Sequence, residues 1–189
     1  MPQKAVATAL ALFLIASVSS ARAGWVERTD RRVERAGDIG AVAIPLSALA
    51  YSLAIGDHKG ALQLTGSVAA SMLLTEILKR TVLRKRPYHV EGDRKDSFPS
   101  GHTTLAFAGA AYWHRRYGWE IGVPMLAAAS AVGYSRVYAY RHHWSDVMAG
   151  AVIGSGVTLL ITGGYRKPGA HVSVTPTPGG ARLDVGWAY

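Results

Sequence analysis

The stretch SRVYAYRHHWSD, from Ser135 to Asp146, joins two long apolar segments of the chain. It carries an arginine, two adjacent histidines and an aspartate among aromatic side chains. Charged and titratable groups between apolar segments are costly to bury unless they pair or bind a ligand. The stretch is therefore the first place to look for chemistry, and its apolar flanks indicate a helical bundle.

The composition favours a membrane protein or a very helical interior rich in alanine and glycine. Apolar residues make up 49% of the 189 residues and charged residues 17%, against about 25% charged in soluble domains. The formal net charge of +9 is typical of proteins that meet nucleic acid, anionic lipid or an anionic substrate. The cations stand in short clusters between apolar runs rather than along one face, which argues against nucleic acid. Cysteine is absent, so no disulfide or thiolate chemistry is expected.

Five apolar segments predict an all-α membrane bundle of about five helices, after an N-terminal signal or first helix. They span residues 39–56, 61–83, 99–116, 119–138 and 145–164. The longer ones approach the roughly 20 residues that a spanning helix needs. The last holds Gly150 and Gly154 at the GxxxG spacing, which lets helices approach closely in a bilayer. The third segment is short, so a soluble periplasmic helical domain stays open as an alternative.

The two ends of the chain differ from the bundle. Residues 1–23 resemble a secretory signal, in which Lys4 precedes an apolar core and a small-x-small cleavage pattern ends at Ala23. An uncleaved first membrane helix is the alternative. The bundle domain is expected over residues 24–165. Residues 166–189 form a tail rich in β-branched residues around a Gly-Gly pair, which predicts a small hairpin or a disordered segment.

Loop charges predict the orientation in the membrane. If residue 25 lies outside, three positive clusters lie inside, in agreement with the positive-inside rule. Those clusters are Lys59, Arg115-Arg116 and Arg166-Lys167. The same threading places Ser135–Asp146 outside, together with the basic run Arg84–Arg86. An anionic substrate would explain a basic cluster on the outer side.

Two earlier stretches are candidate partners of Ser135–Asp146. They are KRTVLRKRP, from Lys79 to Pro87, and FPSGH, from Phe98 to His102. Lys79, Arg86 and Arg136 would lie at the same end of the bundle. Arginine matches phosphate oxygens with its planar fork, and lysine acts as a point charge. The three cations therefore predict an anion site.

A helix start and two histidines complete this site. Ser100 and Gly101 open a helix, where free backbone N–H groups and the helix dipole bind anions; Ser100 is also an ordinary N-cap residue. His142 and Asp146 lie four positions apart, so on a helix the carboxylate can hold one ring nitrogen and leave the other as a base or nucleophile. His102 supplies a second imidazole, suited to protonating a leaving oxygen.

In this order and spacing, the three stretches resemble the signature of the type 2 phosphatidic acid phosphatase superfamily. Lys79 is followed by six residues and Arg-Pro; then comes FPSGH; then Ser-Arg, five residues, His, three residues and Asp. The superfamily includes membrane-bound lipid phosphatases, bacterial class A acid phosphatases and vanadium haloperoxidases. The apolar segments on both sides of the match are similar to those of the membrane-bound members.

The resemblance implies a role for each residue. His142 would attack phosphorus to give a phosphohistidine, and Asp146 would orient it. His102 would be the general acid for the leaving group and then the base for water. No metal or other cofactor is implied. The residues expected to hold the phosphoryl oxygens are Lys79, Arg86, Ser100, Gly101 and Arg136.

Other polar residues near the site are not expected to take part in the reaction. His143 competes with His142 for the nucleophile position, and the spacing from Arg136 and to Asp146 selects His142. Four further residues are expected to line the entrance or to meet lipid headgroups: Arg84, Lys85, His89 and Arg141.

The expected function is a metal-independent phosphatase of the bacterial inner membrane, with its active site open to the periplasm. Its substrate would be a lipid phosphate or diphosphate, such as phosphatidylglycerophosphate, undecaprenyl diphosphate, phosphatidic acid or a lipid A phosphate. Its partners would be that substrate and the membrane lipids. The alternatives are a soluble periplasmic acid phosphatase for small phosphomonoesters, a vanadate-dependent haloperoxidase and a non-enzymatic membrane scaffold.

Overall fold

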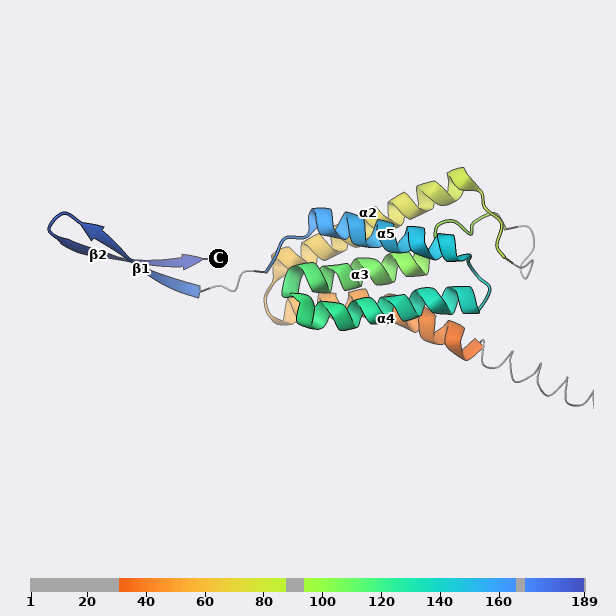
Figure 1. Ribbon diagram of the computed structural model, residues 1–189, viewed down its shortest axis with the longest axis horizontal. Helices are drawn as coiled ribbons and strands as arrows, with labels where there is room; N and C mark the ends of the chain where they lie inside the picture. The colour runs from red at the N-terminus through yellow and green to blue at the C-terminus, as the bar shows by residue number, and fades with distance from the viewer. Residues whose placement is uncertain (1–30, 88–93, 166–168, 189) are drawn as a thin grey trace, which may run out of the picture.

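The computed structural model describes residues 31–87, 94–165 and 169–188, which form five helices and one β-hairpin (Figure 1). The helices are Arg31–Ala54, α2 (His58–Val82), α3 (Gly101–Tyr117), α4 (Trp119–Tyr138) and α5 (Trp144–Ile161). The predicted all-α bundle is therefore confirmed. The predicted signal segment, residues 1–23, lies outside the described residues.

Three of the described helices are long and apolar enough to cross a membrane: Arg31–Ala54, α2 and α5. α3 packs against α2, α4 and α5 and so lies at the centre of the bundle. Its buried positions are mostly small, including Ala106, Gly109 and Ala110. Small side chains let neighbouring helices come close, which explains why the short Ala/Gly-rich segment is the central helix.

Turn residues set the ends of the helices. The carboxylate of Asp57 accepts a hydrogen bond from the backbone N–H of Gly60 at 2.9 Å and so caps the start of α2. Leu83 ends α2 in the left-handed conformation, with φ of 49°. Gly118, with φ of 105°, separates α3 from α4 at a backbone angle that favours glycine.

The GxxxG pair lets α5 lie directly on α3. A Cβ at Gly150 would stand 2.6 Å from the carbonyl oxygen of Ser100, and a Cβ at Gly154 would collide with the carbonyl oxygen of Thr104. The close helix approach expected from the spacing is confirmed, and the partner helix belongs to the same chain.

Gly154→Leu is expected to destabilise the bundle by about 1–3 kcal/mol or more, because the new side chain meets the backbone of α3. Gly156→Leu, on the same helix, is the matched control, since no heavy atom lies within 4 Å of a Cβ built there. Thermal unfolding of the two variants in detergent provides the comparison. Equal unfolding midpoints would contradict the described packing.

The C-terminal tail forms the hairpin that the sequence left as one of two possibilities. β1 (Gly169–Thr177) and β2 (Gly180–Ala188) pair antiparallel, with Val174 opposite Leu183. Gly179 supplies a positive φ of 106° in the turn. The hairpin projects from the end of the bundle opposite the α4–α5 connection (Figure 1).

A buried ion pair ties the hairpin end of the bundle together. Arg116 donates to both carboxylate oxygens of Asp57, at 2.7 and 2.5 Å, and also to the carbonyl oxygens of Gly163 and Gly164 at 2.9 and 3.1 Å. The pair thus links the start of α2, the end of α3 and the segment after α5. Arg116 is 7% exposed. The sequence placed Arg116 among the charges of an inner loop, whereas the structure buries it against Asp57.

Candidate active site

The connections α2–α3 and α4–α5 meet at the other end of the bundle (Figure 1) and border a pocket of about 300 Å³. The residues that line it are Val42, Met72, Lys79, Arg86, Asp96, Gly101, His102, Leu105 and His142. Five of the predicted site residues are thus at the pocket surface. The other three, Ser100, Arg136 and Asp146, are buried behind it.

The imidazole of His142 is held in one orientation. His142 lies in the α4–α5 connection and is 5% exposed. Its Nδ1 is 2.8 Å from the carbonyl oxygen of Ser97. A carbonyl can only accept, so Nδ1 carries the hydrogen and Nε2 keeps its lone pair. The Asp146 carboxylate is farther from Nδ1, at 3.8 Å, so the Ser97 carbonyl makes the shorter contact.

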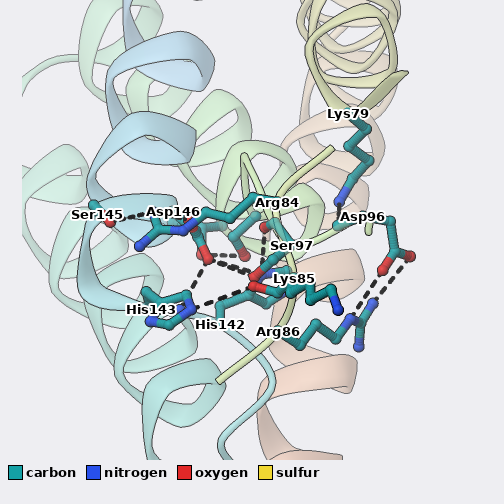
Figure 2. Close-up of polar contacts among 12 residues, drawn as sticks. Lys79, Arg84, Lys85, Arg86, Asp96, Ser97, His142, His143, Ser145 and Asp146 are labelled. Atoms are coloured by element: carbon teal, nitrogen blue, oxygen red, sulfur yellow. Dashed lines mark hydrogen bonds and ion pairs between the residues drawn. The ribbon is translucent and has the colours of Figure 1, made fainter. Parts of the chain in front are cut away.

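Asp146 binds groups that surround His142 (Figure 2). It is fully buried near the start of α5, where the helix dipole favours an anion. Oδ2 accepts from the Ser97 hydroxyl at 2.6 Å and from the backbone N–H of His143 at 2.9 Å. Ser97 therefore binds both Asp146 and His142. No motif marked Ser97 in the sequence, although it directly precedes FPSGH.

Arg84, an expected entrance residue, contacts two residues at the start of α5. Its Nη1 donates to Oδ1 of Asp146 at 2.8 Å and to the hydroxyl of Ser145 at 2.6 Å (Figure 2). Arg84 thus pairs with a buried carboxylate while its side chain stays 36% exposed, and its expected contact with the entrance or with lipid headgroups stays a prediction. Arg141 donates to Glu34 at 2.7 Å, and His89 lies outside the described residues.

The surroundings of His142 favour its neutral form. Burial lowers the pKa of His142, and the nearby cations Lys79 and Arg86 lower it further. The contacts with Asp146 and with the Ser97 carbonyl act in the opposite direction, but the net pKa is below the ordinary histidine value. The Nε2 lone pair is therefore available at neutral pH.

Lys79 and Arg86 converge on Asp96 at the pocket surface (Figure 2). Arg86 binds both carboxylate oxygens, at 3.0 and 3.2 Å, and Lys79 Nζ donates to the Asp96 carbonyl at 2.5 Å. Burial raises the pKa of Asp96, but Arg86 and Arg94 outweigh it and lower the pKa to about 2. Asp96 is thus a permanent counter-ion of the predicted phosphate-binding cations. No motif marked it in the sequence.

The start of α3 is bound to α5. Gly101, its first residue, lines the pocket. The N–H of Ser100 donates to the carbonyl oxygen of Asp146 at 3.0 Å, and its hydroxyl accepts from Thr103 at 2.9 Å. Ser100 occupies the N-cap position of α3, as expected, but its hydroxyl makes no capping hydrogen bond. Its role in phosphate binding stays a prediction.

Arg136 and His102 both contact Asp38, an acid of the helix Arg31–Ala54. The Nη1 of Arg136 lies 2.6 Å from Oδ1 of Asp38, and the Nε2 of His102 lies 3.1 Å from the same oxygen. Arg136 is 2% exposed and does not line the pocket. Asp38 stands just before the apolar segment 39–56, and no motif marked it in the sequence. Phosphate binding by Arg136 stays a prediction.

The two adjacent histidines face different surroundings. His142 lines the pocket, whereas Nε2 of His143 lies 3.3 Å from the carbonyl oxygen of Lys85 (Figure 2). This placement agrees with the choice of His142 from the spacing.

The fold and the pocket define a class of protein: a membrane helical bundle with a buried histidine beside cations. The chain belongs to the PAP2 superfamily, whose family model matches residues 60–169. The predicted superfamily is thereby confirmed.

The chain is similar to several curated lipid phosphatases. It is 28% identical over 162 residues to a lipid A 4′-phosphatase of Helicobacter pylori, covering 77% of this chain and 79% of that protein. It is 33% identical over 125 residues to a lipid A 1-phosphatase of Rhizobium etli, covering 58% of this chain and 52% of that protein. It is 31% identical over 144 residues to lipid phosphate phosphatase 2 of Arabidopsis thaliana, covering 54% of this chain and 49% of that protein. The chain thus spans about half the length of the last two relatives.

A solved structure has the same fold. The crystal structure of Aquifex aeolicus LpxE matches with a TM-score of 0.60 and 24% identity, over 70% of this chain and 84% of that chain.

Proposed function

We propose that this chain is a phosphatase that removes phosphate from a membrane lipid, with His142 as the nucleophile. The observation that carries the proposal is the arrangement around His142. The Ser97 carbonyl holds Nδ1 and leaves the Nε2 lone pair, in a pocket also lined by Lys79 and Arg86. A neutral imidazole beside cations is suited to attack on an anionic phosphoryl group.

The proposed reaction has two steps. First, Nε2 of His142 forms a bond to phosphorus while the bond from phosphorus to the leaving oxygen breaks, and His102 gives that oxygen its proton. Then a water molecule attacks phosphorus, His102 takes its proton, and the phosphorus–nitrogen bond breaks. One water is consumed, and one alcohol (or phosphate) and one inorganic phosphate are released. Lys79, Arg86 and the backbone of Gly101 stabilise the charge on the phosphoryl oxygens.

A lipid is the favoured substrate class. Three of the described helices are apolar enough to cross a membrane, and the residues that line the pocket lie at one end of the bundle, where a headgroup can enter. The relatives above are named as phosphatases of lipid A or of lipid phosphates. The individual candidates are phosphatidylglycerophosphate, undecaprenyl diphosphate, phosphatidic acid and a lipid A phosphate.

Phosphate release from a panel of these lipids, in EDTA, tests the proposed activity. At least one lipid should be hydrolysed by the purified chain, and vanadate, an anion shaped like phosphate, should inhibit the reaction. Turnover of small phosphomonoesters without turnover of any lipid would favour the alternative function, an acid phosphatase. No phosphate release from either substrate class would contradict both.

We also place the protein in the bacterial inner membrane, with the pocket on the periplasmic side and with residues 1–23 acting as an export signal. The clusters Lys59 and Arg166-Lys167 support this orientation through the positive-inside rule. Washing membranes with carbonate should leave the protein in the pellet. Release into the supernatant would support a soluble periplasmic protein instead.

The reactivity of His142 should persist below the pH at which an ordinary histidine is half protonated, about 6.5. Its pKa is below that value, so protonation consumes the Nε2 lone pair only at lower pH. Substrate phosphates titrate in the same pH range, with a second pKa of about 6. Their titration would hide that of His142 in a plot of rate against pH. The better measurement is the rate of inactivation by a histidine-acylating reagent as a function of pH. Only the part of the inactivation that vanadate prevents is counted. A midpoint above 6.5 would contradict the described environment.

A further inference from the structure

We propose that Asp38 positions His102 for proton transfer, a role that rests on the proposed lipid phosphatase function. One carboxylate oxygen of Asp38 lies 3.1 Å from Nε2 of His102 and 2.6 Å from Nη1 of Arg136. Asp38 belongs to the helix Arg31–Ala54 and lies outside residues 60–169, the part matched by the family model.

The ion pair with Asp38 favours one arrangement of protons on His102. A carboxylate beside Nε2 favours a proton on that nitrogen. His102 also lines the pocket, which leaves Nδ1 for the leaving oxygen. Asp38 thus forms an ion pair at one nitrogen of His102, whereas the Ser97 carbonyl makes a hydrogen bond with Nδ1 of His142.

Asp38 also provides the charge that proton donation requires. To give a proton from Nδ1 while Nε2 keeps its hydrogen, His102 must first be an imidazolium. Burial opposes that form most, the positive charges of Arg136, Lys79 and a protonated His142 oppose it as well, and the pKa of His102 is lowered. Asp38 is the anion beside the ring that favours the imidazolium against these effects.

Contacts between the helix Arg31–Ala54 and α4 hold Asp38 in this place. The backbone carbonyl of Glu34 accepts from Nη2 of Arg136, one turn before Asp38. At Gly37 the helix touches α4 so closely that a Cβ would stand 2.5 Å from Arg136 Nη2 and 2.9 Å from the Cβ of Ser135. The missing side chain at Gly37 therefore lets the carboxylate next to it reach both Arg136 and His102.

A purely structural role for Asp38, as the counter-ion of buried Arg136, predicts a different result from a role in proton transfer. A proton donor matters for a poor leaving group, such as the alkoxide of a lipid, and matters little for p-nitrophenolate. The quantity to compare is kcat/KM, because it reports only the steps up to release of the leaving group.

Asp38→Asn is expected to lower kcat/KM for a lipid phosphate by on the order of 10²-fold, the lower end for a general acid, and to change that for p-nitrophenyl phosphate only a few-fold. Asp38→Glu, which keeps the anion, should recover part of the lipid activity if Asp38→Asn folds poorly. Glu76→Gln is the control, because Glu76 is an exposed acid paired with Arg80. Glu76→Gln should leave kcat/KM unchanged for both the lipid phosphate and p-nitrophenyl phosphate.

Equal losses on both substrates, or no loss on either, would overturn the role of Asp38 while leaving the proposed function intact. Wild-type protein that hydrolyses neither substrate would overturn the proposed function, and the role of Asp38 with it.

Discussion

Replacing His142 with alanine is expected to lower kcat for lipid phosphate hydrolysis by on the order of 10³-fold or more, as removal of a covalent nucleophile does in other enzymes. The substitution removes the only atom in the proposed reaction that bonds to phosphorus before water does. Phosphate release by the purified variant in detergent, compared with wild type at saturating substrate, gives the value.

The neighbouring histidine provides the control. His143→Ala is expected to stay within a few-fold of wild type, because the imidazole of His143 contacts the Lys85 carbonyl and is not among the residues that line the pocket. The backbone N–H that His143 donates to Asp146 is kept in this variant. A larger loss in His143→Ala than in His142→Ala would reverse the assignment of the nucleophile.

The largest effect on stability is expected at the opposite end of the bundle. Arg116→Ala should lower the free energy of unfolding by about 3–5 kcal/mol, because it leaves the Asp57 carboxylate buried without its cation. The carbonyl oxygens of Gly163 and Gly164 lose their donor as well. Denaturant unfolding in detergent measures the change.

Arg115→Ala is the matched control, since Arg115 is exposed and its side chain bonds the carbonyl oxygen of Thr162. We expect a change within about 0.5 kcal/mol, typical of surface substitutions. Similar losses in the two variants would contradict the importance of the buried pair.

The same pair has a pH signature. Burial raises the pKa of Asp57, but the hydrogen bonds from Arg116, Gly60 and Tyr117 outweigh it, so its pKa lies below the ordinary 3.8. The stability from Asp57 is therefore present above about pH 4 and is lost as the pH falls through the lowered pKa. Arg116→Ala should lose less stability than wild type over that acid range.

The spacing of the motifs predicted which residues meet at the pocket. Lys79, Arg86, His102 and His142 come from segments far apart in sequence, yet all of them line it. Two contacts differ from those that the sequence suggested. The Asp146 carboxylate lies nearer to the backbone N–H of His143 and to Arg84 than to Nδ1 of His142. Arg136 is buried and pairs with Asp38.

Counter-ions were the part of the site that the sequence could not provide. Asp38 and Asp96 pair with site cations from a helix and a loop that carry no recognisable pattern. Which acid meets which cation depends on how the helices pack, as at Gly37 against α4. Ser100 is the N-cap residue of α3, as its type predicted, but its contacts depend on packing: its N–H binds the Asp146 carbonyl and its hydroxyl accepts from Thr103.

The central claim, a phosphoryl group carried by His142, is tested most directly by trapping the intermediate. In His102→Ala, p-nitrophenyl phosphate should still phosphorylate His142, since its leaving group needs no proton, while attack by water slows for lack of a base. The phosphoprotein should then accumulate, and base-quenched samples can be digested and read by mass spectrometry, with fragmentation separating His142 from His143. We predict phosphate on His142. Phosphate on His143, or turnover without any phosphorylated histidine, would contradict this mechanism.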